Sequence, residues 1–187
     1  MKSIYSMTLF LFMTSILFSS PINDFHTKYK IFLKGLGKIK IGMTKSEIEK
    51  ATGLNLGSDN SHGEGQEDGY ACEMYELKKD KKELGISLML TSEKKQTPKL
   101  GRIYISSKKI HTKSGIKIGD TIKKLLKTYP DNLKKESNHY TGTPIYVFTP
   151  KDKKDQNFRI SFETDGKVIT EISVGKIPEI EYVEGCS

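Results

Sequence analysis

The amino-acid sequence predicts an α+β fold made of two tandem repeats, each with a short helix packed on a small antiparallel β-sheet. The segment 39–48 (IKIGMTKSEI) returns as 116–125 (IKIGDTIKKL), 77 residues later. Two shorter matches follow in the same order, at offsets of 72 and 67 residues. Ordered self-similarity of this kind indicates a duplicated module. We assign the first repeat to residues 35–110 and the second to residues 111–187.

Residues 1–20 have the features of a signal peptide. A basic start at Lys2, the apolar run Met7–Phe18 and the small residues Ser19 and Ser20 are typical of one. The run is shorter than the ~20 apolar residues that a membrane span needs, and an uncleaved N-terminal anchor is the alternative. We expect a periplasmic or secreted protein with no stable membrane insertion, in which residues 21–34 form a leader of uncertain structure.

The first repeat opens with a short extended segment, 38–41, and continues as a helix over 45–52. Thr44 and Glu47 have the spacing of a capping box, and Gly53 suits the left-handed position that closes a helix. A polar loop, 57–69, comes next. Alternating apolar residues then predict strands at 72–77, 84–90 and 102–106, with a charged hairpin loop at 78–83.

The second repeat follows the same order. Thr121 opens its helix, Ile122, Leu125 and Leu126 form the apolar stripe, and Pro130 stops it. A polar loop is expected at 131–143 and a charged one at 151–156. Strands are predicted at 158–162 and 168–174, joined by a turn at Asp165-Gly166.

The apolar face of each small sheet must be covered, because about 75 residues alone make a marginal core. We expect the helix of each repeat to cover part of that face and the other repeat to cover the rest or continue the sheet. The predicted core residues are Ile41, Ile48, Ile86, Leu88, Ile103, Ile105, Ile118, Leu125, Ile160, Phe162 and Ile172.

The chain is basic, with a formal net charge of +8. The charge comes almost entirely from lysine, since Arg102 and Arg159 are the only arginines. Specific contacts to bases and phosphates favour the guanidinium group, so we expect no nucleic-acid partner. The carboxylates between 59 and 76 and the lysines of the second half could steer a partner protein. A solvated, lysine-rich surface is the simpler interpretation.

Two cysteines, Cys72 and Cys186, predict one disulfide in an oxidising compartment. This bond would tie the first repeat to the C-terminal segment. Two free thiols or an intermolecular bond are the alternatives. One cysteine pair cannot supply the four ligands of a structural zinc site.

The sequence lacks the common catalytic motifs, so we expect no enzyme, no cofactor and no metal. His62 and His139 share the repeat offset of 77 residues, each in the loop after its helix. They are either matched ligand positions or inherited loop residues. The acidic loop 57–69 does not have EF-hand spacing.

Tyrosines are the better candidates for binding, because an aromatic ring with a hydroxyl is a good interface anchor. The same residues could equally be half-buried strand positions. The candidates are Tyr70, Tyr75, Tyr104, Tyr140 and Tyr146.

The order and length of the repeat resemble those of the beta-lactamase inhibitory proteins. The Ile41-Gly42-Met43-Thr44 start of the first helix is similar to that of the small lipoprotein of the barrel-assembly machinery. The first resemblance implies tandem α/β modules whose sheets form a concave, protein-binding face. Two features depart from the inhibitor pattern: Cys72 and Cys186 lie in different repeats, and the chain has no Trp.

These observations predict an exported, non-catalytic protein-binding module, an inhibitor or an envelope accessory factor whose partner is an unidentified protein. An exported hydrolase with an unrecognised site is one alternative. A structural envelope protein is the other.

Overall fold

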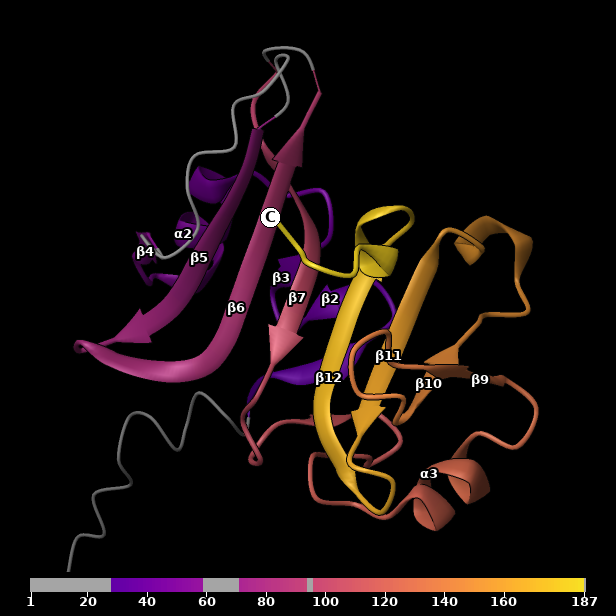
Figure 1. Ribbon diagram of the computed structural model, residues 1–187. Helices are drawn as coiled ribbons and strands as arrows, with labels where there is room; N and C mark the ends of the chain where they lie inside the picture. Colours follow the sequence, from indigo (N-terminus) through magenta and orange to yellow (C-terminus); the bar gives the residue numbers. More distant parts are fainter. Residues whose placement is uncertain (1–27, 59–70, 94–95, 187) are drawn as a thin grey trace, which may run out of the picture.

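The computed structural model of the chain describes residues 28–58, 71–93 and 96–186, and within them strands dominate over two short helices. This is an α+β fold, as the sequence predicts (Figure 1). In chain order the elements are β1 Lys30–Phe32, β2 Gly35–Leu36, β3 Ile39–Lys40, α2 Lys45–Thr52, β4 Leu56–Ser58, β5 Ala71–Lys79, β6 Lys82–Ser92, β7 Lys99–Ile105, β8 His111–Thr112, α3 Ile122–Thr128, β9 Leu133–Ser137, β10 Pro144–Phe148, η1 Lys153–Asp155, β11 Phe158–Thr164, β12 Ile169–Lys176 and η2 Glu179–Glu181.

The larger sheet has eight antiparallel strands in the order β4-β5-β6-β7-β12-β11-β10-β9. Its two halves meet where β7 pairs with β12, so the strands after α2 and the strands after α3 form one continuous sheet (Figure 1). Each half has four strands, whereas the sequence located three in the first repeat and two in the second. Strands β4 and β9 overlap the segments predicted as polar loops, 57–69 and 131–143, and β10 lies outside every predicted strand.

The smaller sheet has the order β3-β2-β1-β8. Its strand β1 lies in the segment predicted as a leader, and it pairs in parallel with β8 of the second half, Lys30 opposite His111. The part of the leader that the structure describes is therefore built into the fold, and Ile31 is fully buried. The predicted signal peptide lies outside the described residues.

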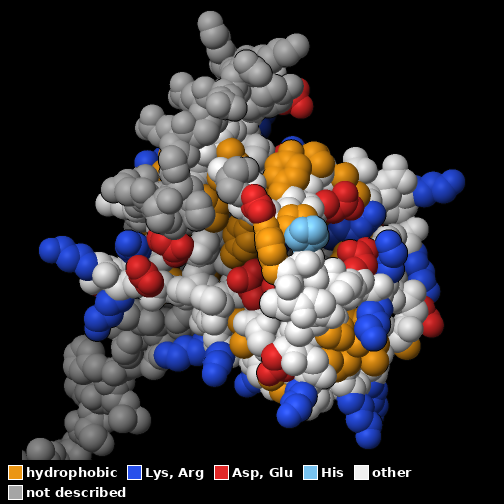
Figure 2. Space-filling model, viewed as in Figure 1, with side chains coloured by type: hydrophobic (Ala, Val, Ile, Leu, Met, Phe, Trp, Pro, Cys, Tyr) orange, Lys and Arg blue, Asp and Glu red, His pale blue; other side chains and the backbone are white. Residues whose placement is uncertain are grey.

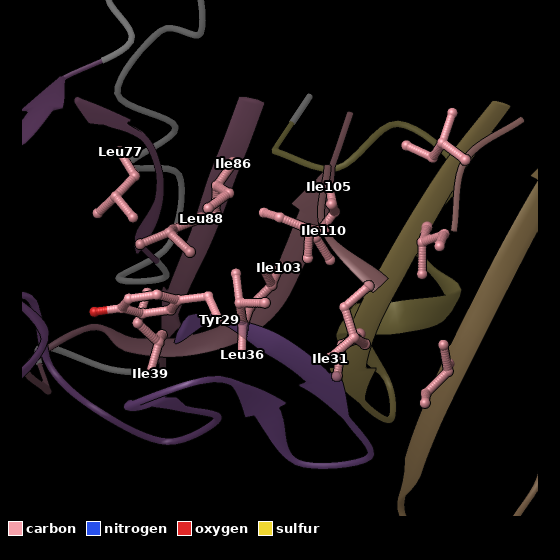
Figure 3. Packing of buried hydrophobic residues seen from close by; sticks show 14 of the residues in the cluster. Tyr29, Ile31, Leu36, Ile39, Leu77, Ile86, Leu88, Ile103, Ile105 and Ile110 are labelled. Atoms are coloured by element: carbon pink, nitrogen blue, oxygen red, sulfur yellow. The ribbon is translucent and has the colours of Figure 1, made fainter. Parts of the chain in front are cut away.

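The smaller sheet covers one face of the larger one, as Figure 3 shows. Tyr29, Ile31, Leu36 and Ile39 from the smaller sheet and its flank pack toward strands β5 to β7. Together with buried residues from α2, α3 and the second half of the large sheet, they form one hydrophobic cluster. Since this cluster contains residues from both halves of the large sheet and from the smaller sheet, all of these parts share one core.

Local signals set the helix ends. Thr44 Oγ1 accepts from the Glu47 amide at 3.3 Å, and Glu47 Oε2 accepts from the Thr44 amide at 2.8 Å, which completes the capping box. Gly53 closes α2 with φ 70°. In α3 Leu125 is fully buried, but Leu126 is 43% exposed, so its place in the apolar stripe was predicted wrongly. A helix this short turns only its Leu125 face fully inward.

Ten of the eleven predicted core residues are buried. The exception is Ile41, which is half-buried and packs against the edge of the cluster. Strand β3 ends at Lys40, and its inward position is Ile39, which is fully buried. Ile41 would share the inward face of Ile39 only if the strand continued, and it lies beyond the end of β3.

Two hairpin turns lie where the sequence predicts them, and the first is shorter than expected. The predicted loop 78–83 reduces to Asp80 and Lys81, with φ of 51° and 64°, a geometry that joins two strands through two residues. The Asp165-Gly166 turn joins β11 to β12, and the Asp165 carboxylate accepts from the amides of Lys167 and Val168, each at 2.8 Å. Among the described helices, none has the length and apolar character to cross a membrane.

Candidate functional site

A pocket of about 310 Å³ lies on the face of the large sheet that points away from the hydrophobic cluster. Figure 2 views the molecule from this side, where hydrophobic, acidic and basic side chains lie close together. One wall is the C-terminal segment, Ile180–Val183, and the other is the connection between β9 and β10. The floor comes from β7, β10 and β11: Arg102, Ile145, Val147, Arg159, Ser161 and Glu163.

Strand register arranges the floor in rows across the sheet. In β11, Ile160 and Phe162 point into the core, so Arg159, Ser161 and Glu163 share the open face. Their partners on β12 are Gly175, Ser173 and Glu171 respectively. Arg102 and Tyr104 on β7 stand opposite Gly175 and Ser173.

The charge of the open face therefore changes from one row to the next, from positive to neutral to negative. One row holds Arg102 and Arg159, the next holds Ser173 and Ser161, and the third holds Glu171 and Glu163. The third row continues through Ile145 of β10 to Glu136 of β9. Both arginines thus lie at one end of the pocket floor, and Glu163 and Glu136 lie at the other, with Glu171 beside Glu163 on β12.

Arg102 is only 7% exposed, and several contacts hold its side chain in place. Its Nη1 donates to the Tyr182 carbonyl at 2.9 Å, and its Nη2 lies 3.4 Å from Ser173 Oγ. The guanidinium stacks on Tyr104, with Cζ 4.2 Å from the ring centroid. Its Nε is buried and has no hydrogen-bond partner among the described residues. A buried guanidinium edge without a partner is costly unless a ligand completes it.

The carboxylates of the third row form no ion pair with Arg102 or Arg159 within the described residues. Glu171 Oε1 accepts a hydrogen bond from Ser173 Oγ at 3.3 Å. Burial, and then the charge of Glu163, raise the pKa of Glu171. Like charges opposite each other in an antiparallel pair oppose folding, so this pair is better explained by binding than by stability.

The variant Glu171→Gln is therefore expected to raise the free energy of unfolding at pH 7 by about 0.5–1 kcal/mol. The folded protein resists ionising Glu171, so the cost exists only at pH values where that carboxyl is charged. Urea unfolding should show the gain at pH 7 and no difference near pH 3. Glu181→Gln, an exposed wall position, is the matched control. A gain of equal size at both pH values would contradict the explanation.

The C-terminal segment crosses the open face because the strands beneath it carry glycine. A Cβ on Gly101 would lie 2.6 Å from Glu179 Cγ, and one on Gly175 would lie 3.1 Å from Ile180 Cβ. Glu179 is buried there and accepts from Thr91 Oγ1 at 2.9 Å. The segment thus lies directly on the backbone of β7 and β12.

Cys72 and Cys186 form a disulfide, as the sequence predicts, and it fixes the far end of the segment to β5. Between these anchors, the Tyr140 hydroxyl donates to Glu184, so the segment also touches the β9–β10 connection. The two walls of the pocket therefore meet at this contact. A disulfide is compatible with an exported protein.

The variant Gly175→Val is expected to destabilise the fold by about 1–3 kcal/mol, because the added side chain would collide with Ile180 and the Gly101 carbonyl. Urea unfolding provides the measurement. Gly57→Val is the control, since the nearest atom there is 3.6 Å from the added Cβ and belongs to the flexible Lys78 side chain. Equal effects of the two substitutions would show that the segment does not depend on close contact.

The structure brings together three of the candidate residues from the sequence. His139 and Tyr140 line the pocket, with their ring centroids 5.0 Å apart. Tyr104 lies on the same face, half-buried beneath the C-terminal segment, where a Cβ on Gly185 would be 3.2 Å from its hydroxyl. These three residues belong to one continuous surface.

Two other candidates lie on the opposite face of the sheet. Tyr146 is 7% exposed and packs in the core. Tyr75 is half-buried beside the cluster, with Lys45 Nζ 4.7 Å from its ring centroid. Burial, together with a 2.6 Å hydrogen bond to Glu73, raises the pKa of Tyr75 to about 12. His62, Tyr70 and most of the acidic loop lie outside the described residues.

The charged floor residues were not among the candidates from the sequence. The signal for them was present in the two strand sequences RISFE (159–163) and EISVG (171–175). Each alternates core residues with a polar row, and their antiparallel pairing aligns serine with serine and glutamate with glutamate. In the described part of the chain, no group of three His, Cys, Asp or Glu residues has a geometry suited to a metal ion.

The sequence model of the family described as "Protein of unknown function (DUF1131)" matches residues 15–154. The chain belongs to this family. The match to the family ends before β11, so it includes the β9–β10 wall of the pocket but not the C-terminal wall. A crystal structure of the uncharacterized protein yfeY from Escherichia coli is similar at 15% identity, covering 79% of this chain and 99% of that chain, with a TM-score of 0.46. Comparison with curated proteins finds no match.

Proposed function

We propose that the protein is an exported, non-catalytic binding module that engages another protein through the charged pocket and its rim. The observation that carries the proposal is the exposed apolar rim. Among the described residues, four large hydrophobic side chains are at least 40% exposed, and three of them, Tyr140, Tyr182 and Val183, line the pocket. Exposed aromatic and aliphatic side chains around a concave site are typical of protein-binding surfaces.

The rigid setting of this rim supports the same proposal. The C-terminal segment is held by the disulfide, by Arg102 and by the close fit over Gly101 and Gly175. A preorganised surface loses less conformational entropy when a partner binds. The partner is a protein rather than a nucleic acid, because the pocket mixes carboxylates with its two arginines.

We also propose that the two halves descend from one duplicated module and that the protein works in the periplasm or outside the cell. The common order of helix and four strands in each half supports duplication. The disulfide supports an oxidising compartment. The resemblance to secreted inhibitors agrees with both proposals.

Affinity capture from envelope extracts tests the proposed binding. We expect the wild-type protein to retain a stoichiometric partner, and the double variant Tyr182→Ala/Val183→Ser to retain at least tenfold less of it. Leu126→Ser is the control, because Leu126 is also a large exposed hydrophobic residue but lies on α3 and does not line the pocket. Equal capture by the rim variant and the control would contradict a role for the rim.

A hydrolase is the second candidate function, because Glu163 and His139 line the same pocket and Glu163 lies opposite Glu171, whose pKa is raised. A carboxylic acid with a raised pKa can serve as a general acid. Turnover of a peptide or glycan by the purified protein, abolished by both Glu163→Gln and Glu171→Gln, would favour the enzyme over the binding module.

A further inference from the structure

One end of the molecule carries most of the net charge of the chain. It is formed by residues 106–128, which include α3, and by the β11–β12 turn, residues 165–168; we call it the basic end. These residues contain eight lysines and two carboxylates, an excess of six positive charges in a chain whose net charge is +8. Figure 2 shows lysine side chains projecting along this lower edge of the molecule. Charge concentrated in so few residues indicates a surface for an anionic partner.

Strand directions and backbone contacts bring the two segments of the basic end together. Strands β7 and β11 both run toward this end, and β12 starts from it (Figure 1). The amide of Gly119 donates to the Ile169 carbonyl at 2.9 Å, and the amide of Ile122 donates to the Lys167 carbonyl at 3.2 Å. The helix α3 and the β11–β12 turn therefore belong to one surface.

The outer side of α3 combines positive charge with an exposed apolar side chain. Leu126 is 43% exposed, and among the described residues it is the one large exposed hydrophobic side chain that does not line the pocket. Lys123 and Lys127 flank it and are exposed. Neither lysine forms an ion pair within the described chain, whereas Lys124 pairs with Asp120 at 2.8 Å. Lysines that attract anionic head groups and a leucine that enters the apolar boundary are the two components of interfacial membrane binding.

We infer that the basic end docks on the surface of an anionic lipid bilayer, with its lysines at the head groups and Leu126 at the boundary with the acyl chains. A bilayer fits this end better than a nucleic acid does, because the end has no arginine. The described chain also begins beside this end, since Lys30 of β1 lies opposite His111 of β8. A retained N-terminal anchor, the alternative to a cleaved signal peptide, would hold the same end toward a membrane.

Docking at the basic end leaves the pocket free. No residue of 106–128 or 165–168 lines the pocket, which lies on the open face of the large sheet. Membrane docking and partner binding therefore use separate surfaces, and each can be lost without the other.

Flotation with lipid vesicles provides the test. Protein purified from the exported fraction should bind vesicles of two parts phosphatidylcholine to one part phosphatidylglycerol at least tenfold more tightly than vesicles of phosphatidylcholine alone. Raising the salt from about 0.1 M to about 1 M should release the protein, because the reach of the lysine charges falls from about 10 Å to about 3 Å. Salt release is measured on the wild type, so it gives a result even if a variant fails to fold.

Substitutions at the basic end locate the contact. The triple variant Lys123→Gln/Lys127→Gln/Lys167→Gln should weaken binding to the anionic vesicles about 100-fold, since each lysine near a charged lipid surface contributes about fivefold. Arginine at the same three positions should keep wild-type binding, because the attraction depends on charge. Leu126→Ser should weaken vesicle binding about fivefold and leave capture of the pocket partner unchanged.

The matched control removes the same charge at the opposite end. Lys99 begins β7 and Lys153 precedes β11, while Lys50 lies on α2, whose N-cap residue forms a β-bridge with Lys99. All three are exposed, and none forms an ion pair in the part of the chain that the structure describes. The seven residues of β7 alone separate the ends by about 20 Å, so Lys50→Gln/Lys99→Gln/Lys153→Gln should change binding by less than twofold.

Three results would overturn the inference: equal binding to neutral and anionic vesicles, equal losses from the two triple glutamine variants, or no binding to either vesicle. Binding of polyglutamate without vesicle binding would assign the basic end to an acidic protein instead. Thermal unfolding of each variant confirms that it is folded. If vesicles bind as expected but no partner protein is captured, the proposed function fails and the inference stands. If capture depends on Tyr182 and Val183 while no vesicle binds, the reverse holds.

Discussion

Replacing both cysteines, Cys72→Ser and Cys186→Ser, is expected to lower the free energy of unfolding by about 2–5 kcal/mol. The bond closes a loop with a sequence separation of 114 residues, so it restricts the unfolded chain strongly. It also fixes the segment that forms one wall of the pocket, so partner binding should weaken in the same variant. Urea unfolding and the capture experiment measure the two effects.

Reduced wild-type protein is the control for the double serine variant. Both lack the covalent link, so both should lose similar stability and similar binding. If the variant unfolds at the same urea concentration as the oxidised wild type, the bond does not constrain the fold. If binding survives unchanged, the C-terminal segment keeps its place through Arg102 and Glu179 alone.

Phe162→Ala is expected to cost about 3–5 kcal/mol, because removal of a buried aromatic ring leaves a cavity in the core. Phe162 is fully buried, and its ring centroid lies 6.0 Å from that of Tyr129. It alternates with Ser161 and Glu163, so the same strand anchors the core and presents the pocket floor. Chemical denaturation measures the change.

Leu126→Ala is the control for the Phe162 substitution. Leu126 was expected to share the apolar stripe of α3 but is 43% exposed, so its truncation should change stability by less than about 0.5 kcal/mol. A loss close to that of Phe162→Ala would mean that α3 packs more deeply than the structure indicates.

Short-range signals explain which parts of the fold the sequence predicted well. Thr44, Glu47 and Gly53 define the ends of α2 through contacts within a few residues, and alternation identifies β6, β7, β11 and β12. Apart from the extended segment 38–41, which contains β3, the smaller sheet escaped prediction because its strands have two or three residues, too few for a periodic pattern. Strand β9 escaped it because its lysine-rich sequence is typical of an exposed edge as well as of a loop.

The pocket was harder to predict because pairing between distant strands creates it. Arg102 and Arg159 become neighbours only when β7, β12 and β11 are in register. The carboxylate pair likewise depends on Glu163 lying opposite Glu171. Tyrosine was a reasonable guide, since Tyr104 and Tyr140 belong to this surface, but composition alone could not separate them from Tyr75 and Tyr146 on the opposite face.

Methyl NMR of the protein bound to its captured partner tests the central claim, that binding takes place on the open face of the large sheet. The methyl groups of Ile145, Val147 and Val183 line the pocket, whereas those of Ile48 and Leu126 report on the helices. We expect the partner to shift the pocket methyl signals and to leave the helix signals in place. Shifts confined to Ile48 and Leu126, with the pocket signals unchanged, would contradict the account.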